Sequence, residues 1–179
     1  MDALREAIAA GSELVWRQPH ALQQEFELRA GPEGRVVATL RLERAFGTLA
    51  TAATAAGTWT FKRVGFWHPR ITVRAPGADD DRAVFDPSWT GSGSLAIAGG
   101  PTFRWKATNF WYTRWDWQTA DGAVALHFAN QQGLARLEGQ VGVEPAGRGL
   151  PELDLLITLG WYLIVLRAND DATVVAATT

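Results

Sequence analysis

Cationic and aromatic side chains alternate near the middle of the chain, where Arg104 and Lys106 flank Trp105. Residues two apart on a strand share a face, so both cations should point outward while Trp105 points into a core. Converging cations could hold a phosphorylated lipid headgroup through charge-assisted hydrogen bonds. Arg63 and Arg114, on other middle strands, are further candidates for this site. The alternative is an outer face on which these charges are only solvated.

The three histidines form no ligand or catalytic pattern. His20 and His68 border prolines in predicted turns, and His127 lies between two apolar residues of a predicted strand. None has a partner at the spacing that a metal site or an acid–base pair requires. We therefore predict a structural or solvent-exposed role for each.

Other polar clusters also lack the spacing of a known site. The acidic run 79–81 could hold a cation, but it lacks the calcium-loop pattern and fits a solvated loop. The Gly-Ser run 91–94 has neither the lysine of a phosphate-binding loop nor a nucleophile elbow. The chain has no Cys, which excludes thiol chemistry and disulfides. We expect no enzyme, no metal and no cofactor.

Composition narrows the choice of partner. The 179 residues carry 17 Lys and Arg against 19 Asp and Glu, a net charge of −2, which argues against a nucleic-acid partner. Arg is far commoner than Lys, but the arginines are scattered, so codon bias explains them better than phosphate recognition. No signal-peptide pattern opens the sequence, so we expect a cytoplasmic protein.

Period-two alternation dominates the chain after a short helical segment that ends at Gly11. Turn residues separate the runs, as at Gly99-Gly100 and Asp121-Gly122, which favour hairpins. Regular short strands of this kind predict an all-β barrel or sandwich. The predicted strands are 12–18, 23–30, 35–42, 47–55, 58–66, 68–75, 83–89, 91–99, 101–107, 110–118, 123–130 and 134–143.

The end of the sequence departs from this pattern. Leu155–Leu166 contains no charged residue and is apolar on every side of a helix, so it must be buried. A membrane span needs about 20 such residues, so a buried core helix is favoured over a membrane anchor or a partner-docking helix. We predict a helix over residues 151–167, with Arg167 in its last turn and Asn169 as its cap.

A barrel of about twelve strands is too wide for its own side chains to fill, and an apolar helix through it would fill it. We therefore predict one domain over residues 1–179, with an antiparallel barrel over 12–145 closed around the helix and short tails. Trp111, Trp115 and Trp117 should share the inward face of one strand. A closed barrel has no free edge, so we expect a monomer.

Four segments resemble the tubby-like fold, shared by the tubby C-terminal domain, the phospholipid scramblases and the LURP-one-related proteins. They are 50–75, with small residues before a Trp strand; 89–110, with a Gly-Gly hairpin; 115–128, with an Asp-Gly turn; and 150–166, the hydrophobic helix. The resemblance extends over residues 12–168 and implies twelve strands around a central helix.

The resemblance also implies a function. By its resemblance to these families, the chain is expected to be a non-enzymatic binding module. Its partner would be an anionic phospholipid at a membrane surface, or a protein. In the tubby domain a Lys-x-Arg pair on a strand contributes to phosphoinositide binding, and Arg104-Trp105-Lys106 has similar spacing with the residue types exchanged. A scramblase-like protein whose helix enters the bilayer is one alternative, and an enzyme without a recognisable motif is another. We expect a peripheral location at most, with no transmembrane span.

Overall fold

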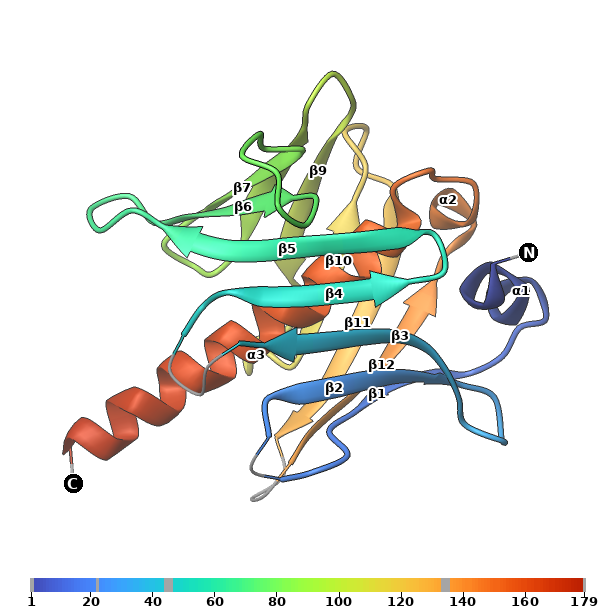
Figure 1. The fold of residues 1–179 in the computed structure, drawn as a ribbon, viewed down its shortest axis with the longest axis horizontal. Helices are drawn as coiled ribbons and strands as arrows, with labels where there is room; N and C mark the ends of the chain where they lie inside the picture. The colour runs from blue at the N-terminus through green and yellow to red at the C-terminus, as the bar shows by residue number, and fades with distance from the viewer. Residues whose placement is uncertain (1, 22, 44–46, 133–135, 179) are drawn as a thin grey trace.

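The computed structural model describes residues 2–21, 23–43, 47–132 and 136–178. Twelve antiparallel strands form a closed barrel around a long C-terminal helix, α3 (Leu153–Thr178), which confirms the predicted fold class (Figure 1). Each strand pairs with its neighbours in sequence, and β1 pairs with β12 to close the ring. The strands are β1 (Leu14–Arg17), β2 (Glu25–Ala30), β3 (Arg35–Leu42), β4 (Ala50–Thr54), β5 (Gly57–Val64), β6 (Arg70–Arg74), β7 (Ala83–Pro87), β8 (Gly93–Ile97), β9 (Thr102–Ala107), β10 (Arg114–Gln118), β11 (Val124–Gln132) and β12 (Leu137–Val143).

Two short helices cover the end of the barrel at which α3 begins (Figure 1). The N-terminal helix α1 (Ala3–Ala9) starts where the Asp2 carboxylate accepts the Leu4 backbone N–H at 3.0 Å, a typical N-cap. It ends before Gly11, whose φ of +68° suits a chain reversal, as predicted. The one-turn helix α2 (Pro145–Arg148) was not predicted.

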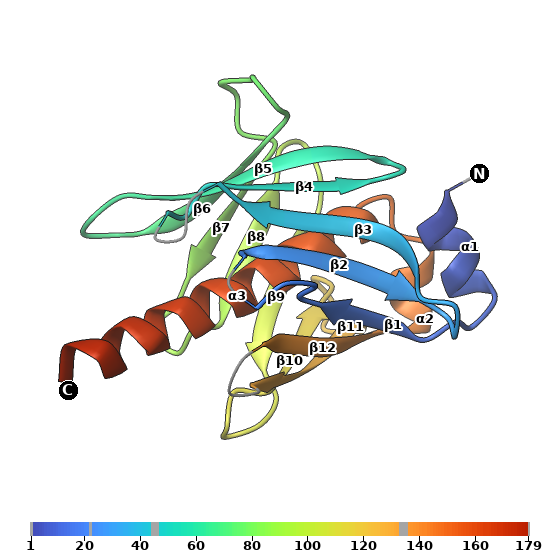
Figure 2. The same ribbon diagram turned by 60° about the horizontal axis from the view of Figure 1, so that its bottom comes forward.

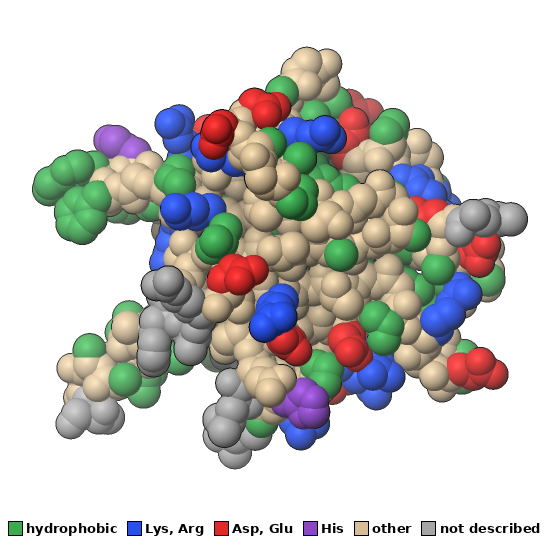
Figure 3. Space-filling model, viewed as in Figure 1, with side chains coloured by type: hydrophobic (Ala, Val, Ile, Leu, Met, Phe, Trp, Pro, Cys, Tyr) green, Lys and Arg blue, Asp and Glu red, His purple; other side chains and the backbone are tan. Residues whose placement is uncertain are grey.

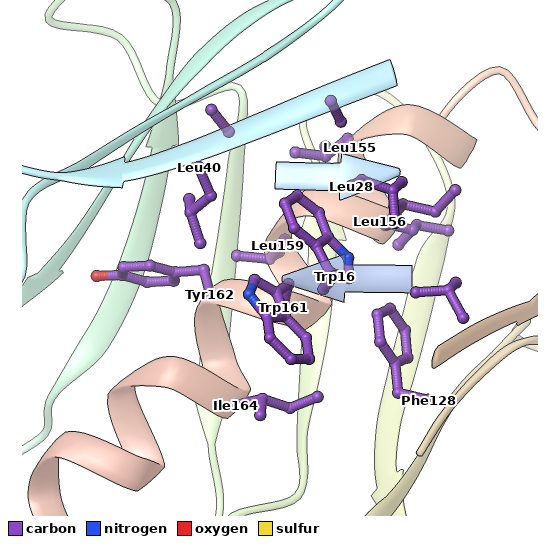
Figure 4. Packing of buried hydrophobic residues seen from close by; sticks show 14 of the residues in the cluster. Trp16, Leu28, Leu40, Phe128, Leu155, Leu156, Leu159, Trp161, Tyr162 and Ile164 are labelled. Carbon is purple, nitrogen blue, oxygen red and sulfur yellow. The ribbon is translucent and has the colours of Figure 1, made fainter. Parts of the chain in front are cut away.

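The core lies where α3 meets the inward side chains of the strands. From Leu153 to Leu166 the helix is buried except at Leu163, which is partly exposed. Trp161 stacks on Trp16 of β1 with ring centres 5.6 Å apart, and Phe128 of β11 lies nearby (Figure 4). Each large side chain buried in this way contributes about 1.5–3 kcal/mol. The apolar segment is thus enclosed by protein on every side except at Leu163.

Two glycines let the helix approach the wall of the barrel. A Cβ at Gly160 of α3 would lie 2.5 Å from Phe128 Cζ, and one at Gly139 of β12 would lie 2.6 Å from Trp161 Cζ3. Both distances are too short for a real side chain. Glycine at these two positions is therefore a condition for the large aromatic residues to fit between helix and strands.

Two local predictions were wrong. The helix does not end near Arg167 but continues to Thr178, because no Gly or Pro follows Asn169 to stop it. Its last turns leave the barrel and extend past the strand ends (Figure 2). Trp111 does not share a face with Trp115 and Trp117: those two are buried on β10, but Trp111 precedes the strand and is exposed.

Candidate functional site

The two ends of the barrel carry different kinds of loop. At the end where α3 leaves, which we call the mouth, the loops include 65–69, 88–92 and 108–113, with the sequences GFWHP, SWTGS and TNFWYT. These three loops contain aromatic residues and no Asp or Glu. At the opposite end, loops such as 75–82 and 119–123 carry Ala, Gly and Asp. The two ends of the barrel therefore differ in chemical character: aromatic loops lie at the mouth, and loops with Ala, Gly and Asp lie at the opposite end.

Exposed apolar side chains gather at the mouth. Among the described residues, nine large hydrophobic side chains are exposed, and all but Val36 belong to mouth loops or to the emerging part of α3. The five aromatic ones are at least 77% exposed, so almost nothing in the chain covers them. Figure 3 shows hydrophobic side chains on the loop between β5 and β6, which projects at the left of the view. The eight mouth residues are Leu49, Phe66, Trp67, Trp89, Phe110, Trp111, Val174 and Val175.

A hollow of about 600 Å³, which we call the cleft, opens between the mouth loops and α3. Trp67 and Trp89 stand at its rim, and the strands and the helix supply an apolar floor. Trp105 and Trp115 lie in the floor as a parallel stack, with ring centres 5.2 Å apart and planes 6° apart. The floor residues are Ile71, Phe85, Trp105, Trp115, Leu163 and Leu166.

Two arginines border the cleft in different ways. Arg63 of β5 makes a two-pronged ion pair with Asp170 of α3, with N–O distances of 2.7 and 3.1 Å. The hydrogen bond to Asp170 raises the pKa of Arg63 further above its ordinary value. Arg167 of α3 instead stacks on Tyr112, with its guanidinium carbon 4.1 Å from the ring centre. One arginine is therefore neutralised by a carboxylate, and the other is held by aromatic rings.

The cationic residues predicted to form a headgroup site divide into two groups. Arg104 and Lys106 of β9 and Arg114 of β10 are all exposed on the outer face, and Phe103 and Trp105 are buried, as the alternation predicts. We call these three cations the basic strip. Lys106 lies opposite Asp116 of β10 in the ladder, which partly offsets its charge.

Arg63 does not belong to the basic strip. Three strands separate β5 from β9 in the barrel order, and Arg63 is engaged by Asp170 at the cleft. The structure therefore brings three of the four predicted residues onto neighbouring strands and places the fourth elsewhere. The alternation that located Arg104 and Lys106 also holds for Arg63, which lies on the same side of β5 as the buried Phe61.

One histidine has acidic neighbours that sequence spacing did not reveal. His127 Nδ1 lies 3.2 Å from a Glu144 carboxylate oxygen, and His127 faces Asp116 across the ladder on the outer face. Burial raises the pKa of Asp116 above its ordinary value, although the nearby His127 lowers it.

His68 borders the cleft. In the acidic loop, Asp81 pairs with Arg74 at 2.6 Å, as expected of a solvated turn.

No group of His, Asp or Glu in the described ranges has the arrangement of a metal site. Among those same residues, no helix is long and apolar enough to cross a bilayer. Comparison of the chain with models of protein families, with curated proteins and with solved structures gives no match in any of the three.

Sequence reasoning missed the mouth. The sequence did contain a pattern that indicates exposed aromatic residues, in the pairs Phe66-Trp67 and Phe110-Trp111. Two adjacent aromatic residues on a strand cannot both face the core. Each pair lies in a loop, and each puts both rings in solvent. Arg167 was read as the basic end of a helix, since its stacking partner Tyr112 is distant in sequence.

Proposed function

We propose that this protein is a non-enzymatic binding module that docks on a phospholipid surface through its mouth. The observation that carries the proposal is the concentration of exposed apolar side chains at the mouth, eight of the nine among the described residues. Trp is favoured where hydrocarbon meets headgroups, because its ring is apolar and its N–H can still form a hydrogen bond. The mouth presents three Trp and two Phe rings in this way.

The charge pattern of the three aromatic loops supports a lipid surface over a protein partner, although Asp86, Asp170 and Asp171 border the cleft between those loops and α3. The three aromatic loops contain no carboxylate, and exposed cations flank them at Arg70 and Arg114. Neither forms an ion pair with the rest of the described chain, so both are free to face anionic headgroups. Each such cation near an anionic surface contributes about 1 kcal/mol. Lys106, close to the end of β9, adds to the same attraction.

The module is best compared with tubby-like and LURP-one-related proteins, and this assignment is part of the proposal. Its support is the architecture of twelve strands around a C-terminal hydrophobic helix. By this likeness, the basic strip of Arg104, Lys106 and Arg114 would contact lipid phosphate. Arg63 is better explained as the partner of Asp170. The protein would act in the cytoplasm, at the surface of a membrane.

Two alternatives have less support. A scramblase-like lipid mover would require the segment Leu155–Leu166 to leave the barrel, although Leu156 and Trp161 have no exposed surface and fill the interior. Withdrawal of this segment would leave the barrel hollow, and the stabilising free energy from burying several large side chains would be lost. An enzyme would need a reactive cluster. The nearest candidate, His127 with Glu144, lies exposed on the outer face and outside the cleft.

Vesicle flotation tests the proposal. The probes are phosphatidylcholine vesicles, alone and with phosphatidylserine or a phosphatidylinositol phosphate. We expect binding to anionic vesicles, and its loss when Trp67, Trp89 and Trp111 are replaced together by Ser. The matched control is Val36→Ser, which removes the exposed apolar residue at the opposite end and should leave binding unchanged.

A second comparison tests the charges. Arg104→Ala with Lys106→Ala should weaken binding to anionic vesicles and reduce its salt dependence, while Arg63→Ala should not. The proposal is wrong if wild-type protein stays with the unbound fraction at low salt. It is equally wrong if the triple Trp variant floats as well as the wild type, since the mouth would then play no part.

A further inference from the structure

We propose that the cleft is a binding site for an amphipathic anion, a molecule with one apolar chain and a carboxylate or phosphate head, and that Arg167 holds the head. This inference goes beyond docking on a membrane, because the cleft could take such a molecule from solution. It rests on the apolar floor, on the position of Arg167 and on the charges around it.

The floor of the cleft suits an apolar chain. Its six side chains are aliphatic or aromatic, and the stacked rings of Trp105 and Trp115 are two of them. The volume of about 600 Å³ is within the range of about 300–1,000 Å³ that small-molecule sites occupy. The cleft opens at the mouth beside Trp67 and Trp89, so a chain can enter without displacing the helix.

Arg167 is positioned to bind an anion. Its guanidinium carbon lies 4.1 Å from the ring centre of Tyr112 and 5.7 Å from that of Trp115, so the group rests against two aromatic rings. Within the described residues the guanidinium donates no hydrogen bond; its sole ionic contact is with Asp171. A guanidinium carries five N–H donors in a fork that matches carboxylate and phosphate. This fork is oriented in advance and largely unused.

The loop between β7 and β8 also fits around Arg167. Gly91 has a φ of +77°, and a Cβ at that position would lie 2.7 Å from Arg167 Nη1. The backbone of this loop therefore lies directly against the guanidinium, and any side chain at Gly91 would push it away. Together with the two rings, the loop limits the positions that Arg167 can adopt.

The neighbouring carboxylates leave room for an anion. Asp170 is occupied by its two-pronged pair with Arg63. Asp171 Oδ2 lies 4.0 Å from Arg167 Nε, and this side chain is largely exposed, so the contact is weak. Asp86 at the end of β7 is exposed and also borders the cleft, but it makes no ionic contact with Arg167. Asp171 is thus the carboxylate that competes with a bound head.

Calorimetric titration with three amphiphiles of the same chain length tests the inference: dodecanoate, dodecyl phosphate and dodecyltrimethylammonium, each below its micelle concentration. We expect at least one anion to bind about tenfold or more tightly than the cation, because the charge-assisted bonds to Arg167 are lost with a cationic head. Preference for dodecanoate would assign a fatty acid as ligand, and preference for dodecyl phosphate a phosphate-bearing lipid.

Two variants change the head site in opposite directions. Arg167→Gln should remove the preference for anions, whereas Asp171→Asn should tighten anion binding severalfold by removing the competing carboxylate. The matched control is Arg82→Gln, which loses the same charge in the loop 75–82 at the opposite end of the barrel and does not border the cleft. Leu163→Trp, which fills the floor from a partly exposed position, should weaken all three amphiphiles together.

Equal binding of the cation and the anions overturns the inference, as does Asp171→Asn binding no more tightly than the wild type. The second result is informative even if Arg167→Gln fails to fold, because Asp171 is exposed and its replacement leaves the core intact. Neither titration involves a vesicle. Failure here and failure of membrane docking are therefore separate results.

Discussion

The indole N–H of Trp117 donates a 2.9 Å hydrogen bond to the backbone carbonyl of Leu156, and so links the barrel wall to the helix inside it. Both groups are buried. Hydrophobic packing alone would tolerate small rotations of α3 within the barrel, because apolar contacts have little directional preference. This bond and the close approach at Gly160 select one rotation and one depth, and thereby determine which helical residues reach the mouth.

Replacing Trp117 by Phe should destabilise the protein more than replacing Trp16 by Phe. The first change removes a buried donor that is used, whereas Trp16 Nε1 is buried with no partner in the described chain. The expected difference in unfolding free energy is about 1–2 kcal/mol, measured by urea denaturation. An equal loss for both variants would mean that ring volume, and not the hydrogen bond, sets the cost.

Gly160→Ala should be strongly destabilising. The new methyl group would lie 2.5 Å from Phe128 Cζ, and overpacking of this kind costs about 1–3 kcal/mol or more. Gly149→Ala is the matched control, since nothing lies within 4 Å of a Cβ there. Phe128→Leu combined with Gly160→Ala should recover part of the loss. A thermal midpoint for Gly160→Ala equal to that of the control would contradict this packing.

Asp170→Asn should loosen the emerging part of α3 while changing global stability by less than about 1 kcal/mol, because the pair with Arg63 is partly exposed. Amide hydrogen exchange should rise over residues 168–178 and stay unchanged over 153–166. High salt should reproduce the effect in the wild type only weakly, since the two-pronged geometry resists screening. Unchanged exchange over 168–178 would show that the pair does not hold the helix.

Asp154→Asn should stabilise the protein at neutral pH. Asp154 is buried at the start of α3, with Arg5 Nη2 3.3 Å from its carboxylate, and burial raises its pKa above 3.8. The folded state therefore binds the proton more tightly than the unfolded state, and wild-type stability falls as pH rises from 3.8 through the folded pKa. The advantage of the variant should appear above that window and vanish below pH 3.8. Unfolding curves at several pH values measure it.

The architecture could be predicted from sequence because two local patterns agreed. Alternation located the strands, and a charge-free stretch too short for a bilayer identified a helix that needed a large enclosure. The length of that helix was underestimated because its buried part and its exposed part are helical for different reasons. Burial accounts for Leu153–Leu166, but residues 168–178 carry no apolar pattern; they continue the buried helix and are tied to the barrel by the pair of Asp170 with Arg63.

The candidate sites were harder to predict because they depend on contacts between distant segments. Arg104 and Lys106 could be placed outward from alternation on one strand. The stacking of Arg167 on Tyr112 joins residues 55 positions apart, and the pair of Arg63 with Asp170 joins residues 107 apart. Spacing along the chain carries no signal for such pairs.

All twelve strands precede α3 in the chain, so during synthesis all strands of the barrel leave the ribosome before the helical residues that fill its interior. Until Leu153–Leu166 emerges, inward rings such as Trp16 and Trp117 have no partner and offer an adhesive surface to other nascent chains or to chaperones. Assembly must therefore finish in a late step. A transcript truncated just before this segment would yield a product destined for aggregation or proteolysis, not a smaller working protein.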